Sequence, residues 1–382
     1  MERAVSDRQP AALVLEDGTI YRGTAYGAQG STLGEAVFTT GMTGYQETIT
    51  DPSYAGQIVV QTAPHIGNTG VNDEDPESRQ IWVSGYAVRA ASRVASNWRA
   101  TESLAARLER EDVIGIAGID TRAVTLRLRE HGSMRAGIFS GDGMRTDTEM
   151  VAAVLNSPEM SGRNLSAEVS VSEPQRFEAI GERFGLVAVL DLGIKSATIR
   201  YLRERGFDLV VLPQDIAYEQ LRAYDVDALF FSNGPGDPAA SDAHVKLLRS
   251  ALRDGIPYFG ICFGNQLLGR ALGLETYKLP FGHRGINQPV LDVATGRVEI
   301  TSQNHGFAVQ APLGEDFESP AGFGRVRVSH YSLNDDVVEG LEALDIPAFS
   351  VQFHPESASG PRDSMHLFDR LGEAITARKA GN

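Results

Sequence analysis

The sequence has a single cysteine, no long apolar run and fewer basic than acidic residues. One cysteine, Cys262, excludes an internal disulfide and a cysteine-rich zinc site, so its thiol is either structural or reactive. No apolar stretch approaches the roughly 20 residues that a membrane-spanning helix needs. The N-terminus lacks a basic segment followed by an apolar one, the pattern of a secretory signal. We therefore expect a cytoplasmic protein without a membrane partner.

A formal net charge of -15 argues against a nucleic-acid partner, because such binding depends on clustered lysine and arginine. One arginine-rich stretch, 120–135, spaces Val124 and Leu128 four apart, which indicates a helix with a solvated charged face. The sequence contains no G-x-x-x-x-G-K-[ST] phosphate loop, and no histidine spacing resembles a metal site. We expect no metal and no cofactor in this chain.

The length of 382 residues is too great for one ordinary core and predicts two or three domains. Residues 10–150 read as strands and turns with two helices, typical of an α+β domain, and Asp17-Gly18 suits a tight hairpin turn. Residues 151–183 show no sustained period and are interpreted as a linker. A second domain is predicted over 184–378.

In the second domain, apolar runs without alternation are interleaved with helix-like segments. Such runs suit strands buried on both faces, and the helices supply the crossovers. The pattern predicts an α/β fold with a doubly wound, mostly parallel sheet and an antiparallel edge. In this fold ligands gather beyond the carboxyl ends of the strands, where the glycine-rich turn 233–236 and Cys262 both fall.

Cys262 lies between Gly260 and Gly264, the spacing of a nucleophile elbow, in which a sharp strand-to-helix turn exposes the attacking side chain. A helix N-terminus at that place favours the thiolate, which is the attacking species. A lone cysteine is more often a buried small hydrophobe. The glycine spacing and the position at a strand end favour the nucleophile.

His354 and Glu356 could complete a catalytic set with Cys262. In an extended segment residues i and i+2 point to the same side, so the carboxylate of Glu356 can reach the imidazole of His354. A solvated turn is the better interpretation of His-Pro-Glu taken alone. Its position after an apolar strand, in the domain that holds Cys262, favours a base and its partner.

Acyl transfer also needs donors for an oxyanion, usually backbone N–H groups. Phe263, the residue after the candidate nucleophile, would supply one, and Gly234 in the neighbouring turn could supply another. An ordinary loop before a helix is an equally good interpretation of that turn without the elbow beside it.

The motifs SNGPGDP, GICFGNQ and HPE, in this order, resemble those of the class I (triad) glutamine amidotransferases. Segments in the first domain, such as FTTGMTGYQETITDPSY and GIDTRAVT, and later FGHRGINQPV and SQNHGFAV, make nearly the whole chain similar to the small subunits of glutamine-dependent carbamoyl-phosphate synthetase. Many relatives have Leu-Gly-His-Gln after the cysteine, whereas this chain has Phe263-Gly264-Asn265-Gln266.

The resemblance implies that Cys262 is the nucleophile, His354 the base and Glu356 its partner. It also implies a set of residues that line the site for L-glutamine: Ser53, Gly234, Gly236, Phe263, Gln266, Asn304, Gly306 and Phe307. Ser53 belongs to the first domain, and without the resemblance it reads as a turn residue after Asp51-Pro52.

The function that the resemblance implies is glutamine hydrolysis, with ammonia passed to a large ATP-dependent subunit. That partner, in a heterodimer or a higher oligomer, would hold ATP and Mg and make carbamoyl phosphate from bicarbonate for arginine and pyrimidine biosynthesis. Two alternatives are a non-hydrolytic regulatory or binding subunit of the same complex and a free-standing cysteine hydrolase. An α/β-hydrolase would place its acidic residue between nucleophile and histidine in the chain, whereas Glu356 follows His354.

Overall fold

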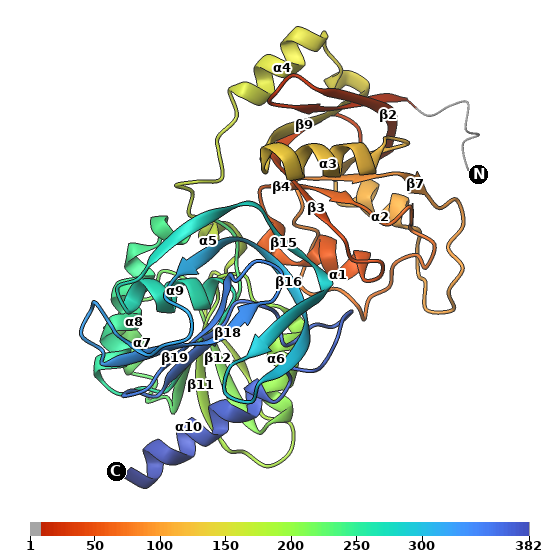
Figure 1. Cartoon of the computed structure of the whole chain (residues 1–382). Helices are drawn as coiled ribbons and strands as arrows, with labels where there is room; N and C mark the ends of the chain where they lie inside the picture. Colours follow the sequence, from red (N-terminus) through yellow and green to blue (C-terminus); the bar gives the residue numbers. More distant parts are fainter. Residues whose placement is uncertain (1–8, 382) are drawn as a thin grey trace. The chain divides into compact units, whose positions relative to one another are not determined.

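The computed structural model describes residues 9–381 and divides the chain into two compact units. The N-terminal unit extends to Met160 and includes Pro280–Arg284, and the C-terminal unit comprises Ser161–Leu279 and the chain from Gly285 onward (Figure 1). The segment predicted as a linker, 151–183, carries the end of α4 (Asp147–Leu155), α5 (Ser166–Val169) and β10 (Gln175–Phe177). Within the described residues no helix is long and apolar enough to span a membrane.

The N-terminal unit is built on a closed barrel with strand order β1-β2-β8-β6-β4-β3-β9. Its strands are β1 (Pro10–Leu15), β2 (Ile20–Gly27), β3 (Ser31–Thr39), β4 (Gln57–Gln61), β6 (Gly85–Val88), β8 (Ile114–Ala117) and β9 (Met134–Ser140). A further pair of short strands, β5 (His65–Ile66) and β7 (Ala90–Ala91), lies outside the barrel. The antiparallel pairing of β1 with β2 confirms the hairpin predicted at Asp17-Gly18.

The helices of this unit are α1 (Tyr45–Thr50), α2 (Leu104–Arg110), α3 (Thr121–His131) and α4, with a short 3-10 turn at Pro52–Tyr54. The arginine-rich stretch forms α3, as predicted. The side chain of Asp120 accepts a hydrogen bond from the N–H of Ala123 and so caps the start of the helix. Val124 and Leu128 are fully buried on its inner face.

The C-terminal unit contains an 11-stranded sheet. Five central strands run parallel in the order β12-β11-β13-β14-β20. Their bounds are β11 (Gly185–Leu190), β12 (Phe207–Leu212), β13 (Ala228–Phe231), β14 (Tyr258–Ile261) and β20 (Ala348–Val351). Helices join the first four of them: α6 (Ser196–Glu204), α7 (Tyr218–Arg222) and α8 (Asp242–Arg253).

The prediction of a mostly parallel sheet holds for these central strands, but the sheet as a whole is mixed. β10 pairs antiparallel with β12 at one side, and β19, β18 and β15 continue the sheet antiparallel beyond β20. No helix interrupts residues 275–343, so these strands lack the crossovers that parallel pairing needs. They are β15 (Glu275–Asp292), β16 (Arg297–Gln310), β17 (Phe317–Glu318), β18 (Arg325–Ser332) and β19 (Val338–Ala343).

Helices cover both faces of the central strands (Figure 1). On β11, Val187 and Val189 pack with residues of α6 and of α10 (Leu367–Gly381). Ala188 and Leu190 point the other way, into a core shared with α7, α8 and α9 (Phe263–Ala271). This is the doubly wound arrangement that the apolar runs predicted, and it leaves the carboxyl ends of the strands to form a site.

Candidate active site

Cys262 forms a sharp turn between β14 and α9. Its φ of 54° and ψ of -97° are a backbone conformation that non-glycine residues rarely adopt. A Cβ on Gly264 would lie 2.4 Å from the carbonyl oxygen of Phe231, and one on Gly260 would lie 2.7 Å from the carbonyl carbon of Gly264. The close approach of helix and strand therefore requires both glycines, as the elbow motif predicts. The N–H of Cys262 donates to the carbonyl of Val351 at 2.8 Å and ties the turn to β20.

His354 and Glu356 lie just after β20, next to β14 in the sheet. The predicted contact between them is present: Nδ1 of His354 is 2.7 Å from Oε1 of Glu356. Lys195 joins this pair, with its Nζ 3.1 Å from Nδ1 of His354 and 3.2 Å from Oε1 of Glu356. All three residues are buried, and Glu356 is fully inaccessible.

The charges of this group fix its protonation. Burial and the ammonium of Lys195 disfavour the protonated imidazole of His354, but Glu356 and Cys262 favour it and raise the pKa of His354 to about 10. Burial acts to raise the pKa of Glu356, but Lys195 and His354 outweigh it and lower that pKa to about 2. At neutral pH the site thus holds an ionised carboxylate and a protonated imidazole.

The thiol of Cys262 faces the region where strand β16 passes. Its Sγ lies 3.7 Å from the carbonyl oxygen of Asn304, to which the thiol can donate. Nε2 of His354 has no hydrogen-bond partner among the described residues, which leaves it available to the thiol. Cys262 is only 2% exposed, so a substrate must enter a largely enclosed site.

The other predicted glutamine-binding residues of the C-terminal unit lie on three segments. Gln266, in the first turns of α9, donates from Nε2 to the carbonyl of Phe307 on β16 at 2.9 Å, and Gly306 adjoins Phe307. Gly234 and Gly236 follow β13, which pairs with β14, so their loop and the elbow share one edge of the sheet. Phe263 buries its side chain in the core and keeps its backbone at the helix start.

Ser53 belongs to the N-terminal unit, in the 3-10 turn after α1. Its N–H donates to the side chain of Asp51 at 2.9 Å, and the residue is buried. Its assignment to the glutamine site stays a prediction.

Lys195 was not among the residues predicted from the sequence. It follows β11, where the side chain of Asp191 accepts hydrogen bonds from the N–H groups of Gly193 and Ile194 and shapes the turn. The signal was a lysine in the loop between a buried strand and the next helix, at the edge of the sheet where ligands collect.

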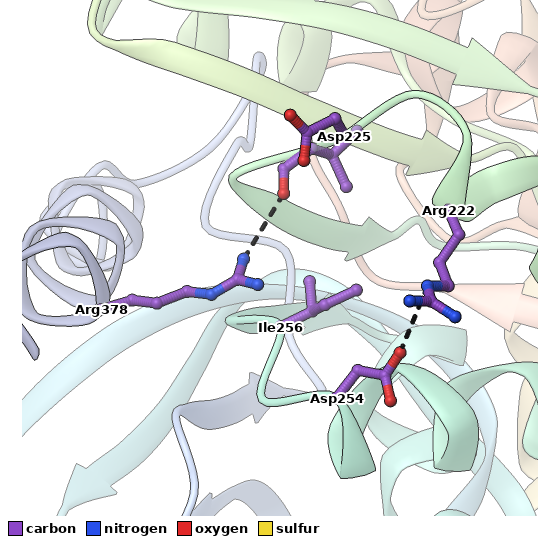
Figure 2. A pocket seen from close by; sticks show the side chains of 6 residues that line it. Arg222, Asp225, Asp254, Ile256 and Arg378 are labelled. Carbon is purple, nitrogen blue, oxygen red and sulfur yellow. Dashed lines mark hydrogen bonds and ion pairs between the residues drawn. The ribbon is translucent and has the colours of Figure 1, made fainter. Parts of the chain in front are cut away.

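A separate pocket of about 360 Å³ lies at the amino ends of β13 and β14 and so is not part of this site (Figure 2). Figure 2 shows Arg222 paired with Asp254 at 3.6 Å and Arg378 reaching a main-chain oxygen, the carbonyl of Val226 at 3.4 Å. Its two arginines and two aspartates balance in charge.

Comparison with known proteins identifies the family. The model for the carbamoyl-phosphate synthase small chain, CPSase domain, matches residues 13–138, and that for glutamine amidotransferase class-I matches residues 188–374. The chain is 58% identical over 373 residues to the carbamoyl phosphate synthase small chain of Streptomyces coelicolor, covering 98% of each chain. The chain belongs to the carbamoyl-phosphate synthase small-chain family.

Two further carbamoyl-phosphate synthase small chains illustrate the breadth of the match. The one from Bifidobacterium longum is 55% identical over 385 residues, covering 97% of this chain and 95% of the relative. The one from Mycobacterium tuberculosis is 56% identical over 371 residues, covering 96% of this chain and 98% of the relative. As a member of this family the chain is the glutamine amidotransferase subunit of a ligase.

Proposed function

We propose that this subunit hydrolyses L-glutamine through Cys262, His354 and Glu356. The observation that carries the proposal is the buried 2.7 Å contact between His354 and Glu356, beside a strained cysteine at the head of α9. The pKa of about 10 for His354 agrees with a site in which imidazole holds the proton that the thiol gives up.

In the first half of the reaction the sulfur of Cys262 attacks the side-chain amide carbon of glutamine. A C–S bond forms, the carbonyl electrons move to oxygen, and backbone N–H groups stabilise that oxyanion. Phe263 supplies one such group, since the first N–H groups of a helix have no partner within it, and Gly234 supplies the second. The C–N bond then breaks, and His354 gives its proton to the departing ammonia.

In the second half, water hydrolyses the thioester. His354, now neutral, takes a proton from the water as its oxygen attacks the thioester carbon. The C–S bond breaks, glutamate leaves, and the proton returns to the Cys262–His354 pair. Glu356 stays ionised throughout and orients the imidazole.

The remaining predicted residues hold the substrate. Gln266, Gly234 and Gly236 lie at the same edge of the sheet as the elbow, and Asn304, Gly306 and Phe307 lie on β16. The resemblance also assigns Ser53 to the glutamine site. Their assignment rests on the resemblance together with the positions of the C-terminal residues near Cys262.

The ammonia passes to a large ATP-dependent subunit that makes carbamoyl phosphate from bicarbonate, for arginine and pyrimidine biosynthesis. The names of the relatives support a synthase with more than one chain. The sequence has no phosphate loop, in keeping with ATP and Mg being held by the partner.

The test measures glutamate release from glutamine by the wild type and by Cys262→Ser, each alone and with the large subunit, bicarbonate and ATP. We expect release that increases with the partner and its substrates and is lost in Cys262→Ser. Size-exclusion chromatography must show that the variant still binds the large subunit. No cysteine-dependent release in any combination would favour the regulatory subunit instead, and ester hydrolysis without a partner would favour a free-standing hydrolase.

A further inference from the structure

Four buried polar side chains form a hydrogen-bonded network beneath the nucleophile turn. Asn265 and Gln266 come from α9, Ser350 from β20, and Gln352 follows β20 two residues before His354. None is more than 3% exposed. The network joins the element that carries the nucleophile to the segment that carries the histidine.

The direction of every bond in the network follows from one backbone carbonyl. The carbonyl of Phe307 only accepts, so the atom of Gln266 at 2.9 Å from it must be the donor Nε2. The same Nε2 lies 3.2 Å from Gln352, so the atom it meets there must be the acceptor Oε1. This Oε1 also accepts from Nδ2 of Asn265 at 3.1 Å.

The last bond closes the chain. With its Nδ2 directed to Gln352, Asn265 turns its Oδ1 to Ser350, whose hydroxyl donates to it at 2.8 Å. Nε2 of Gln352 has no hydrogen-bond partner among the described residues. Rotating the Gln352 amide by 180° would form no hydrogen bond in the network, because its N–H₂ would then face the donor groups of Asn265 and Gln266. The network therefore holds Gln352 in one orientation even though a buried N–H₂ is left over.

We propose that Asn265, Ser350 and Gln352 are positioning residues that, together with the carbonyl of Phe307, hold the Gln266 amide with its Oε1 toward glutamine. Both N–H bonds of Gln266 are used within the protein, so only its Oε1 remains for a ligand. An acceptor oxygen matches the α-ammonium group of glutamine, which can only donate. This inference rests on the proposed function, in which Gln266 contacts glutamine.

Asn265, which stands where many relatives have histidine, can fill the same place in the network. An asparagine and a neutral histidine each have one acceptor atom and one donor atom in the side chain. Either can accept from Ser350 and donate to Gln352, whereas an apolar residue of the same size can do neither.

The test replaces Asn265 with leucine in the full chain assembled with its large subunit, and compares glutamine with glutaramate, which lacks the α-ammonium. We expect KM for glutamine to rise about tenfold with kcat within about threefold, the effect of one hydrogen bond to a charged group. The preference for glutamine over glutaramate, as the ratio of kcat/KM values, should fall about tenfold. Asn265→His should restore both values.

Ser350→Ala is a milder second variant, should Asn265→Leu fold poorly, and should shift the preference in the same direction by a smaller factor. Asn334→Leu removes an exposed amide–amide bond, that to Gln288 at 2.8 Å, and should change nothing. Equal losses for glutamine and glutaramate, or no loss with either, would overturn the positioning role.

A binding measurement separates this inference from the proposed function. Calorimetric titration of Cys262→Ser with glutamine and with glutaramate, with and without Asn265→Leu, needs no turnover. In one outcome the wild type releases no glutamate, and adding Asn265→Leu to Cys262→Ser still removes the preference for glutamine over glutaramate. That outcome would count against hydrolysis alone. Unchanged preference in the double variant would count against the network alone.

Discussion

At the scale of single residues, Lys195 is the charged residue of the site that was not predicted from the sequence. Its ammonium lies 3.1 Å from Nδ1 of His354 and 3.2 Å from the carboxylate of Glu356. It lowers the pKa of both groups. Lys195 thus disfavours the protonated imidazole of His354, which Glu356 and Cys262 favour. The proton on His354 is therefore easier to release.

Lys195→Met should therefore raise the pKa of His354 above its present value of about 10. A more basic imidazole stays protonated in a larger fraction of the molecules, so fewer of them hold the neutral base that accepts a proton from water. We expect kcat for glutamine hydrolysis to fall about tenfold, the equivalent of one pKa unit, with the acidic side of the pH profile of kcat moving to higher pH. Lys195→Arg keeps the charge and is the control. An acidic limb that stays in place in Lys195→Met would show that the ammonium does not act on the base.

The site residues that were predicted from the sequence lie close to their partners in the chain, whereas those that were not predicted lie far from theirs. Gly260, Cys262 and Gly264 form one short motif, and His354 reaches Glu356 two positions away. Lys195 meets His354 across 159 positions of the chain. Ser350 and Asn265 are 85 positions apart, so no spacing rule could pair them.

At the scale of elements, the junction of β14 with α9 carries the geometry of the site. Gly264 lets the helix approach β13 so closely that a Cβ would lie 2.4 Å from the carbonyl oxygen of Phe231, a backbone atom that cannot turn aside. The helix start, and with it the N–H groups for the oxyanion, depends on this contact.

Gly264→Ala should consequently displace α9 and lower both stability and activity. We expect a loss of about 1–3 kcal/mol in the free energy of unfolding, typical of overpacking, and a larger proportional loss of kcat, because the nucleophile moves with the helix. Urea unfolding and glutamate release measure the two effects. Gly372→Ala in α10 is the matched control, since its Cβ would meet no atom closer than 3.7 Å and alanine favours a helix. Similar losses in both variants would contradict the argument.

Elements were predictable where their pattern is local. The unbroken apolar runs predicted the central parallel strands, and α3 was predicted from two apolar residues, Val124 and Leu128, that lie four positions apart. The closed barrel was not predicted, because β1 closes it by pairing with β9, more than a hundred positions later in the chain. An alternating pattern of apolar and polar residues indicates a strand but does not show which other strand it pairs with.

At the scale of the whole molecule, the buried charges of the site tie stability to pH. His354 has a pKa raised from 6.5 to about 10, so its contribution is complete below 6.5 and is lost as pH rises through about 10. Glu356 has a pKa lowered from 4.5 to about 2, so its contribution is complete above 4.5 and is lost as pH falls through about 2. Both contributions are therefore complete between pH 4.5 and 6.5.

Glu356→Gln should destabilise the C-terminal unit most in that window. The substitution leaves the ammonium of Lys195 buried without its nearest carboxylate, which typically costs about 3–5 kcal/mol. We expect the difference in unfolding free energy between wild type and variant to be largest at pH 4.5–6.5 and to shrink as pH approaches 10, because His354 then loses its proton in the wild type too. Urea unfolding across this pH range, followed by a probe in the C-terminal unit, measures the difference.

Asp316→Asn, at the exposed pair with Arg327, is the acid-to-amide control and should show no such pH dependence. A difference for Glu356→Gln that stays constant up to pH 10 would mean that the imidazole does not carry the charge that holds this site together.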